Sequence, residues 1–246
     1  MWRLSVLGSG DAFNSGGALH SAYLIEHGGG KVLLECGAST LAALKKAEIN
    51  PLEIDAVLVS HLHGDHFGGI PFLMLDYLFA SRRRRPFVLA GPPSLCDRVR
   101  SVYAGLYKES HFHQMPFAID QVTIEPGQDL ELRGLRVEAF RVPHVAEPFC
   151  LGYRISVDDS AFLFSGDSAW TDEFVARSRD TDVFLCECCS LDKQTEFHTC
   201  YADILAHRDQ LDCSRLVLTH LGADVRAAGE LAVERAYDGM VLELGT

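Results

Sequence analysis

The sequence predicts a layered α/β or α+β fold in which residues 1–246 form one domain. Short apolar runs typical of strands alternate with amphipathic patterns typical of helices, the order expected of a layered fold. No stretch rich in proline, glycine and serine is long enough to separate two domains. The chain has 246 residues, of which 48% are hydrophobic and 23% charged. A chain of this length can bury roughly 70% of its unfolded surface, so it needs no disulfides to hold a core.

The first half of the chain alternates strands with helices. Gly28-Gly29-Gly30 marks a hairpin turn, Ser39 or Thr40 caps a helix, and Pro92 begins another. The expected strands are Leu4–Leu7, Ala22–Ile25, Val32–Leu34, Ala56–Val59 and Phe87–Ala90. The expected helices are Ser39–Ala47, His66–Ala80 and Pro92–Leu106.

The second half begins with a mainly β region and ends with further alternation. Its expected strands are Val122–Ile124, Leu130–Leu132, Leu135–Val142, Cys150–Val157, Ala161–Phe164, Val183–Cys186, Leu216–Thr219 and Met240–Leu244. Its expected helices are Tyr201–Leu211 and Ala223–Ala228.

The charge balance restricts the class of partner. The 34 acidic and 22 basic side chains give a net charge of −12. This disfavours a protein whose main task is to grip a long polyanion, because such affinity comes from basic surface and counterion release. A small anionic substrate held by metal ions remains compatible with it.

No targeting or membrane segment is evident. Residues 1–7 form too short an apolar run for a secretory signal. The longest apolar stretch, residues 68–80, is interrupted by Pro71 and Asp76. We therefore expect a cytoplasmic protein without membrane contact, in which the eight cysteines are reduced thiols.

The strongest chemical signal follows the fourth expected strand and reads Ser60-His61-Leu62-His63-Gly64-Asp65-His66. Residues two apart at the end of a strand point to the same side, so His61 and His63 can bind one ion together. Gly64 permits a tight reversal, after which Asp65 and His66 can face a second ion from the first turn of a helix. Two-metal hydrolytic sites place their ions ~3.5–4 Å apart, which this spacing suits.

This motif resembles the signature of the metallo-β-lactamase superfamily, and three further matches follow in the family's order. They are Val142-Pro143-His144, Phe164-Ser165-Gly166-Asp167-Ser168 and Val217-Leu218-Thr219-His220. Four motifs in the right order over about 160 residues make the resemblance specific, and it covers essentially the whole chain. It implies a four-layer αββα metallo-β-lactamase sandwich of class α+β.

The resemblance also implies a set of metal ligands. His61, His63 and His144 would bind one ion, Asp65, His66 and His220 a second, and Asp167 would bridge both. The expected cofactor is two Zn²⁺, with Mn²⁺ or Fe²⁺ as alternatives.

Within the superfamily, the chain is most similar to the ribonuclease Z-like phosphodiesterase branch. The similar motifs are Leu7-Gly8-Ser9-Gly10-Asp11, Leu33-Leu34-Glu35-Cys36-Gly37 with Glu in place of the usual Asp, Leu151-Gly152-Tyr153-Arg154 and Phe197-His198-Thr199. The resemblance implies that His198 is the general acid, that Glu187 holds its imidazole, and that the protein forms a homodimer.

Two departures from ribonuclease Z argue against processing of tRNA. The tRNA-gripping arm of that enzyme lies between the third His and the bridging Asp, yet His144 and Asp167 are only 23 positions apart here. The Ser-Arg-Tyr that follows the last His in that enzyme is replaced by Leu221-Gly222-Ala223-Asp224.

The leading functional hypothesis is a dinuclear zinc hydrolase that cleaves a small or cyclic phosphodiester through a metal-bridging hydroxide, which Asp65 would orient. The alternatives with the same ligands are a lactonase or thioesterase, or ribonuclease Z-like RNA processing. An iron-dependent redox enzyme is a further alternative, although a chain of this length has no room for a fused flavin domain.

Two conspicuous clusters remain open. Arg82-Arg83-Arg84-Arg85 either contacts a substrate phosphate or forms a solvated loop, and we favour the loop. Cys186-Glu187-Cys188-Cys189 contains no Cys-x-x-Cys pair, so buried apolar cysteines are the better interpretation.

Overall fold

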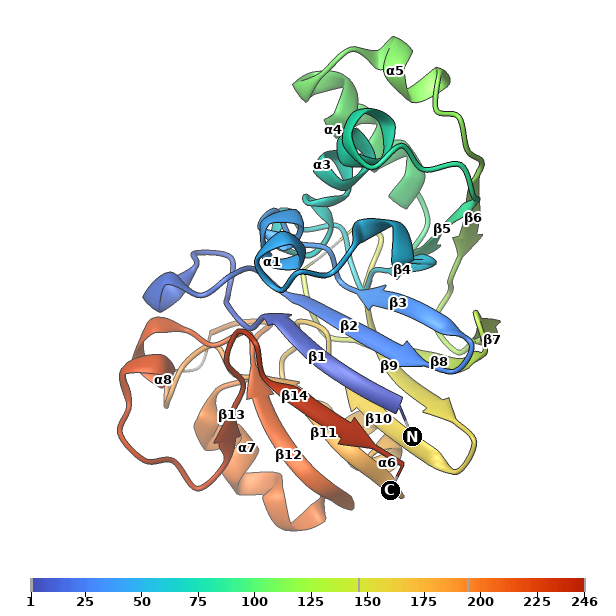
Figure 1. Ribbon diagram of the computed structural model, residues 1–246. Coiled ribbons are helices and arrows are strands. Elements are labelled where there is room, and N and C mark those ends of the chain that lie inside the picture. Colours follow the sequence, from blue (N-terminus) through green and yellow to red (C-terminus); the bar gives the residue numbers. More distant parts are fainter. Residues whose placement is uncertain (1, 146, 194, 246) are drawn as a thin grey trace.

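Two seven-stranded mixed sheets face each other in the computed structural model, which describes residues 2–145, 147–193 and 195–245 (Figure 1). The first sheet has the order β14-β1-β2-β3-β4-β5-β6. Its strands are β1 Trp2–Gly8, β2 Ala22–His27, β3 Gly30–Leu34, β4 Ala56–Leu58, β5 Phe87–Gly91, β6 Ile119–Thr123 and β14 Val241–Leu244. The chain's first and last strands, blue β1 and red β14 in Figure 1, pair antiparallel and bring the two ends close together.

The second sheet has the order β13-β12-β11-β10-β9-β8-β7. Its strands are β7 Asp129–Leu132, β8 Leu135–Val142, β9 Cys150–Val157, β10 Ser160–Phe164, β11 Thr181–Glu187, β12 Cys213–Thr219 and β13 Glu234–Arg235. Strands β10, β11 and β12 run parallel. Strand β8 runs in the same direction, because β9 is antiparallel to both β8 and β10. The carboxyl ends of these four strands therefore meet at one edge of the sheet.

Helices cover the outer faces of both sheets. They are α1 Thr40–Lys46, α2 Gly64–Phe67, α3 Ile70–Leu75, α4 Leu95–Leu106, α5 Glu109–His113, α6 Asp172–Arg177, α7 Tyr201–His207 and α8 Ala223–Ala227. Shorter helical turns are Ser15–Gly17, Pro51–Glu53, Arg208–Gln210 and the π-helical turn Asp76–Ala80. Among these described residues, no helix combines the length and the apolar composition that a membrane span requires.

Burial of alternate side chains on opposite faces produces the layers. In β10, Phe162 and Phe164 pack in the core between the sheets, whereas Leu163 packs against the helices outside because successive strand residues point to opposite faces. A second outer core lies between the first sheet and the helices α1, α3 and α4, and includes Leu44, Met74 and others. The predicted αββα sandwich of class α+β is confirmed.

The expected helix His66–Ala80 is wrong as a single element. The chain forms α2, a break at Gly68 and Gly69, α3 and the π-helical turn. The Gly69 amide donates to the Cys36 carbonyl over 2.8 Å, and a Cβ at Gly69 would lie 2.1 Å from the Gly37 carbonyl oxygen. Close packing against the loop that contains Cys36 and Gly37 therefore interrupts the helix.

Candidate metal centre and catalytic site

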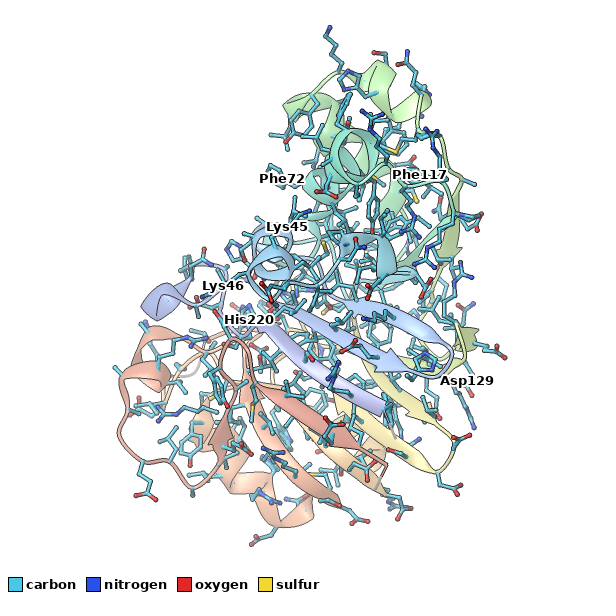
Figure 2. The ribbon with its side chains drawn as sticks, viewed as in Figure 1. Lys45, Lys46, Phe72, Phe117, Asp129 and His220 are labelled. Atoms are coloured by element: carbon cyan, nitrogen blue, oxygen red, sulfur yellow. The ribbon has the colours of Figure 1, made fainter. Side chains whose placement is uncertain are left out.

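The predicted site residues lie where strands of both sheets end. His61 and His63 follow β4 of the first sheet, while His144, Asp167 and His220 follow β8, β10 and β12 of the second. Figure 2 shows His220 near the junction of the two sheets and away from Phe72 and Phe117 in the helical region above. The site therefore joins the two sheets at one end of the sandwich.

Two groups of side chains converge there. The first ligand group contains His61, His63 and His144, and the second contains Asp65, His66, Asp167 and His220. In each group, one candidate ligand atom per residue lies within 4.8 Å of the others. The structure thus brings together all seven residues that the sequence predicts as ligands.

Asp167 is the residue that comes near both groups. Its Oδ1 lies 3.2 Å from Nε2 of His66, and its Oδ2 lies 3.4 Å from Nε2 of His220. The same Oδ2 is 3.9 Å from Nε2 of His61 in the first group. Gly166 makes this placement possible, because its φ is +61° and a Cβ there would lie 2.6 Å from the Leu151 carbonyl oxygen.

Unpaired nitrogen atoms show that the cluster suits a divalent metal. Within the described chain, Nε2 of His61 is buried and forms no hydrogen bond. Nε2 of His66 is also buried without a hydrogen bond, although oxygens of Asp65 and Asp167 each lie 3.2 Å away. Buried polar atoms are rarely left without a partner in native proteins. Imidazole nitrogens and carboxylates are ligands that Zn²⁺ and similar ions accept. The residues present therefore fit a divalent metal centre.

The other ring nitrogen of four histidines faces a polar atom of the protein. His61 Nδ1 is 2.9 Å from Ser60 Oγ, and His144 Nδ1 donates to the Phe197 carbonyl over 3.0 Å. His66 Nδ1 lies 3.3 Å from Glu35 Oε2, and His220 Nδ1 lies 3.8 Å from Glu187 Oε2. Such partners orient metal-binding imidazoles and determine which nitrogen is free to bind.

The backbone is strained at three of these positions. Glu35, Phe197 and His220 adopt left-handed φ values of 60°, 71° and 51°. Each such residue costs on the order of 1–3 kcal/mol and persists only where its surroundings impose it. Strained residues concentrate at functional sites, which agrees with the position of these three.

The pKa shifts of the side chains differ between the two ligand groups. Burial lowers the pKa of His61, His63 and His144 and so favours the neutral imidazole that binds metals. In the second group, burial alone would raise the pKa of Asp65, but His66 and His220 lower it. The pKa of His220 rises to about 9 because Asp167 and Asp65 outweigh its burial. Binding of a cation to the second group therefore releases protons.

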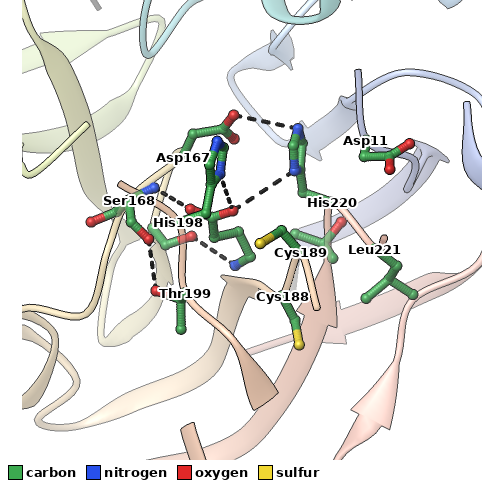
Figure 3. A network of polar contacts seen from close by, with 12 residues as sticks. Asp11, Asp167, Ser168, Cys188, Cys189, His198, Thr199, His220 and Leu221 are labelled. Atoms are coloured by element: carbon green, nitrogen blue, oxygen red, sulfur yellow. Dashed lines mark hydrogen bonds and ion pairs between the residues drawn. The ribbon is translucent and has the colours of Figure 1, made fainter. Parts of the chain in front are cut away.

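His198 and Glu187 form a pair beside the ligands. His198 Nδ1 lies 3.0 Å from Glu187 Oε2, and the His198 ring stacks 6.0 Å from the ring of His220 (Figure 3). Glu187 also accepts a hydrogen bond from the Ser168 amide. Burial lowers the pKa of His198, but Glu187 raises it by more, so the pKa lies above its ordinary value. The imidazole thus lies beside the ligand groups with a raised pKa.

The arginine cluster is partly structural. Arg83 is buried, donates to the carbonyls of Ile54, Arg85 and Pro86, and lies over the ring of Tyr77. Arg85 pairs with Asp55. The expectation of a solvated loop is wrong for Arg83, because aromatic rings and carbonyl groups replace water around its guanidinium.

The cysteines agree with the apolar interpretation. All eight are free, and Cys186 and Cys188 are buried in the core beneath α7 and α8. Glu187, the last residue of β11, points to the face opposite Cys186 and contacts His198 in the site.

Sequence reasoning missed three partners of the ligands. Ser60 and Phe197 contact His61 and His144, and no sequence signal singles out Phe197, whose contribution is a backbone carbonyl. Glu35 stood out only as a departure from the related motif. Its contact with His66 depends on packing between separate segments.

Comparison with known proteins identifies the family. The profile of the family described as anti-Pycsar protein Apyc1 matches residues 2–234. The anti-Pycsar protein Apyc1 of Paenibacillus sp. (strain J14) is 28% identical over 231 residues, which are 92% of this chain and 91% of that protein. Ribonuclease Z of Ignicoccus hospitalis is 35% identical over 147 residues, 60% of this chain and 47% of that enzyme. The chain spans about half the length of the ribonuclease Z relatives that it matches.

Solved structures with the same fold cover almost the whole chain. YhfI of Bacillus subtilis, a metallo-β-lactamase fold protein, superposes with a TM-score of 0.80 at 21% identity, over 99% of this chain and 100% of YhfI. The short form of human tRNase Z superposes with a TM-score of 0.79 at 22% identity, over 99% of this chain and 100% of that enzyme. The predicted resemblance to the metallo-β-lactamase superfamily and its ribonuclease Z-like branch is confirmed.

Proposed function

The chain belongs to the family of the anti-Pycsar protein Apyc1, and we propose that it is a dinuclear zinc phosphodiesterase acting on a small or cyclic phosphodiester. One observation carries the proposal. The two ligand groups, in which Asp167 of the second lies 3.9 Å from His61 of the first, stand directly beside the His198–Glu187 pair. Metal ligands and a proton donor are the two elements that hydrolysis of a phosphodiester needs.

The residues divide into three roles. His61, His63 and His144 would hold one ion, Asp65, His66 and His220 would hold the other, and Asp167 would contact both. When bound, two Zn²⁺ ions supply hydroxide at neutral pH and neutralise charge on the phosphoryl group. Asp65 would also orient the nucleophile.

His198 protonates the departing oxygen. An alkoxide is a poor leaving group at neutral pH, and a positioned acid contributes ~10²–10⁴ to the rate. Glu187 holds the imidazole through Nδ1, so Nε2 is the nitrogen that would donate the proton. The pKa of His198 lies above its ordinary value, so the imidazole is protonated at neutral pH more often than a free one.

Two features favour a small substrate. Between His144 and Asp167 the described chain forms only the β9–β10 hairpin, with no arm to grip RNA. The net charge of −12 supplies no general attraction for a polyanion.

The test combines metal analysis with a substrate panel on one preparation purified without added metal. The panel contains bis(4-nitrophenyl) phosphate, cyclic mononucleotides, a lactone, a thioester and a precursor tRNA. We expect two equivalents of zinc and hydrolysis of the phosphodiesters, with no efficient cleavage of the tRNA at physiological salt. Hydrolysis of the lactone or thioester alone, or a content of iron, would contradict the proposal.

His61→Ala is expected to lower bound metal and to abolish hydrolysis, because it removes a buried ligand of the first group. His113→Ala is the matched control, since His113 is exposed on α5 and contacts Arg100. That control should keep its metal and activity. Full occupancy and turnover in His61→Ala would remove this residue from the ligand set.

A further inference from the structure

One buried carboxylate, that of Glu35, connects to ligands of both groups. Glu35 follows β3 and is fully buried, with a left-handed φ of 60°. Its amide donates to the Leu58 carbonyl over 2.8 Å, and the next amide, that of Cys36, donates to the His66 carbonyl over 2.6 Å. The backbone is therefore held against β4 and α2, the segments on either side of the ligand motif.

The first carboxylate oxygen acts on the first ligand group. Glu35 Oε1 accepts a hydrogen bond from the Ser60 amide over 2.9 Å. The Ser60 hydroxyl is in turn 2.9 Å from Nδ1 of His61. Glu35 thus holds the residue that orients His61.

The second oxygen acts on the second ligand group. Glu35 Oε2 lies 3.3 Å from Nδ1 of His66, and within the described residues neither atom has a hydrogen-bond partner. A carboxylate at this position favours the imidazole tautomer with hydrogen on Nδ1. That tautomer leaves Nε2 free toward Asp65 and Asp167, each 3.2 Å away.

We propose that Glu35 is a positioning residue that orients metal ligands of both groups at once, directly at His66 and through Ser60 at His61. The inference rests on the proposed function, because it assumes that the two groups hold ions. Asp would be one methylene shorter, so from this backbone it could not contact the Ser60 amide and the His66 ring together. The Glu that departs from the related motif therefore has a physical role here.

The test measures stepwise Zn²⁺ binding by competition with a chromogenic chelator, without substrate. In Glu35→Gln, the amide oxygen stays on the Ser60 N–H, which can only donate, and the NH₂ group turns to His66. His66 must then change tautomer and place its hydrogen on Nε2. We expect the affinity for one ion, that of the second group, to fall by ~10–100-fold, while the other changes little.

Two further variants separate this role from a general structural one. Ser60→Ala should lower the affinity for the other ion, that of the first group, because it removes only the contact with His61. Glu125→Gln makes the same chemical change at an exposed position and should alter neither affinity. Thermal unfolding of the metal-free proteins should show similar midpoints for Glu35→Gln and the wild type.

The outcomes distinguish the two proposals. Wild-type protein that fails to bind two Zn²⁺ ions contradicts the proposed function and this inference with it. Wild-type protein that binds two ions, with both affinities unchanged in Glu35→Gln, overturns the role of Glu35 alone. If Glu35→Gln does not fold, Glu35→Asp replaces it, and wild-type affinity for both ions in that variant likewise overturns the role.

Discussion

At His198, the surrounding carboxylate and imidazoles determine whether the side chain is suited to proton transfer. Glu187 holds Nδ1, while the rings of His144 and His220 lie 4.8 Å and 6.0 Å away. His198 is not a member of the two ligand groups defined above, although one of its ring nitrogens lies within 4.8 Å of ligand atoms of His144 and Asp167, and one within 4.8 Å of ligand atoms of Glu187 and His220. This position suits a group that transfers a proton next to the ions.

His198→Ala is expected to keep both metals and to slow substrates with poor leaving groups by ~10²–10⁴-fold. Nitrophenyl esters should be affected much less, because nitrophenolate departs without protonation. Steady-state kinetics on a nitrophenyl ester and an alkyl diester, with metal analysis, provide the comparison. An equal loss on both substrates, or a loss of metal, would rule out the general-acid role.

The pH profile gives an independent check of the same role. A general acid must be protonated, so activity is present below its pKa and lost as the pH rises through it. Because Glu187 raises the pKa of His198, the alkaline limb for an alkyl diester should lie above pH 6.5, the ordinary imidazole value. Glu187→Gln should move that limb to lower pH.

At the scale of elements, the break between α2 and α3 keeps the ligand-bearing turn against its neighbours. The helix α2 carries Asp65 and His66, and its first residue follows His63 directly. Gly69 then packs on the carbonyls of Cys36 and Gly37. A continuous helix would not allow this loop to approach as closely.

Gly69→Ala is therefore expected to destabilise the protein by about 1–3 kcal/mol, the usual cost of overpacking. Gly105→Ala in α4 is the matched control, since a Cβ there meets nothing within 4 Å. It should stabilise by up to about 1 kcal/mol through the higher helix propensity of alanine. Urea unfolding of both variants measures the difference, and equal midpoints would contradict the packing argument.

At the scale of the whole molecule, one core joins the two halves of the chain. The core between the sheets includes Trp2 and Leu244 at the two ends, together with residues of nearly every strand. Each sheet therefore depends on the other for its buried face. We propose on this basis that residues 1–246 form one domain.

This domain organisation predicts a single cooperative unfolding transition. The chain has two tryptophans, Trp2 in the core between the sheets and Trp170 beside the helices of the second sheet. In Trp2→Phe and in Trp170→Phe, the remaining tryptophan should report the same urea midpoint as far-UV circular dichroism. A fluorescence transition that precedes the loss of secondary structure in either variant would indicate separate units.

The sequence by itself predicted the layered fold, and its resemblance to the metallo-β-lactamase superfamily implied the seven residues that converge. The spacing of apolar residues in strands and helices is a local property of the sequence. Apolar runs such as Leu135–Val142 therefore predicted their strands. The spacing of His61, His63, Asp65 and His66 is equally local, and each later ligand lies just beyond a strand. Their roles as ligands stay a prediction, although their grouping follows from strand ends of both sheets that meet at one end of the sandwich.

Only the tertiary structure determines which residues contact the predicted ligands from the protein side. Glu35 contacts His66 across 31 positions, and the Phe197 carbonyl contacts His144 across 53. The burial of Arg83 and the helix break at Gly69 also depend on surfaces supplied by other segments. Such contacts follow from how the elements pack and from backbone strain that packing imposes, and neither leaves a period or a spacing in the sequence.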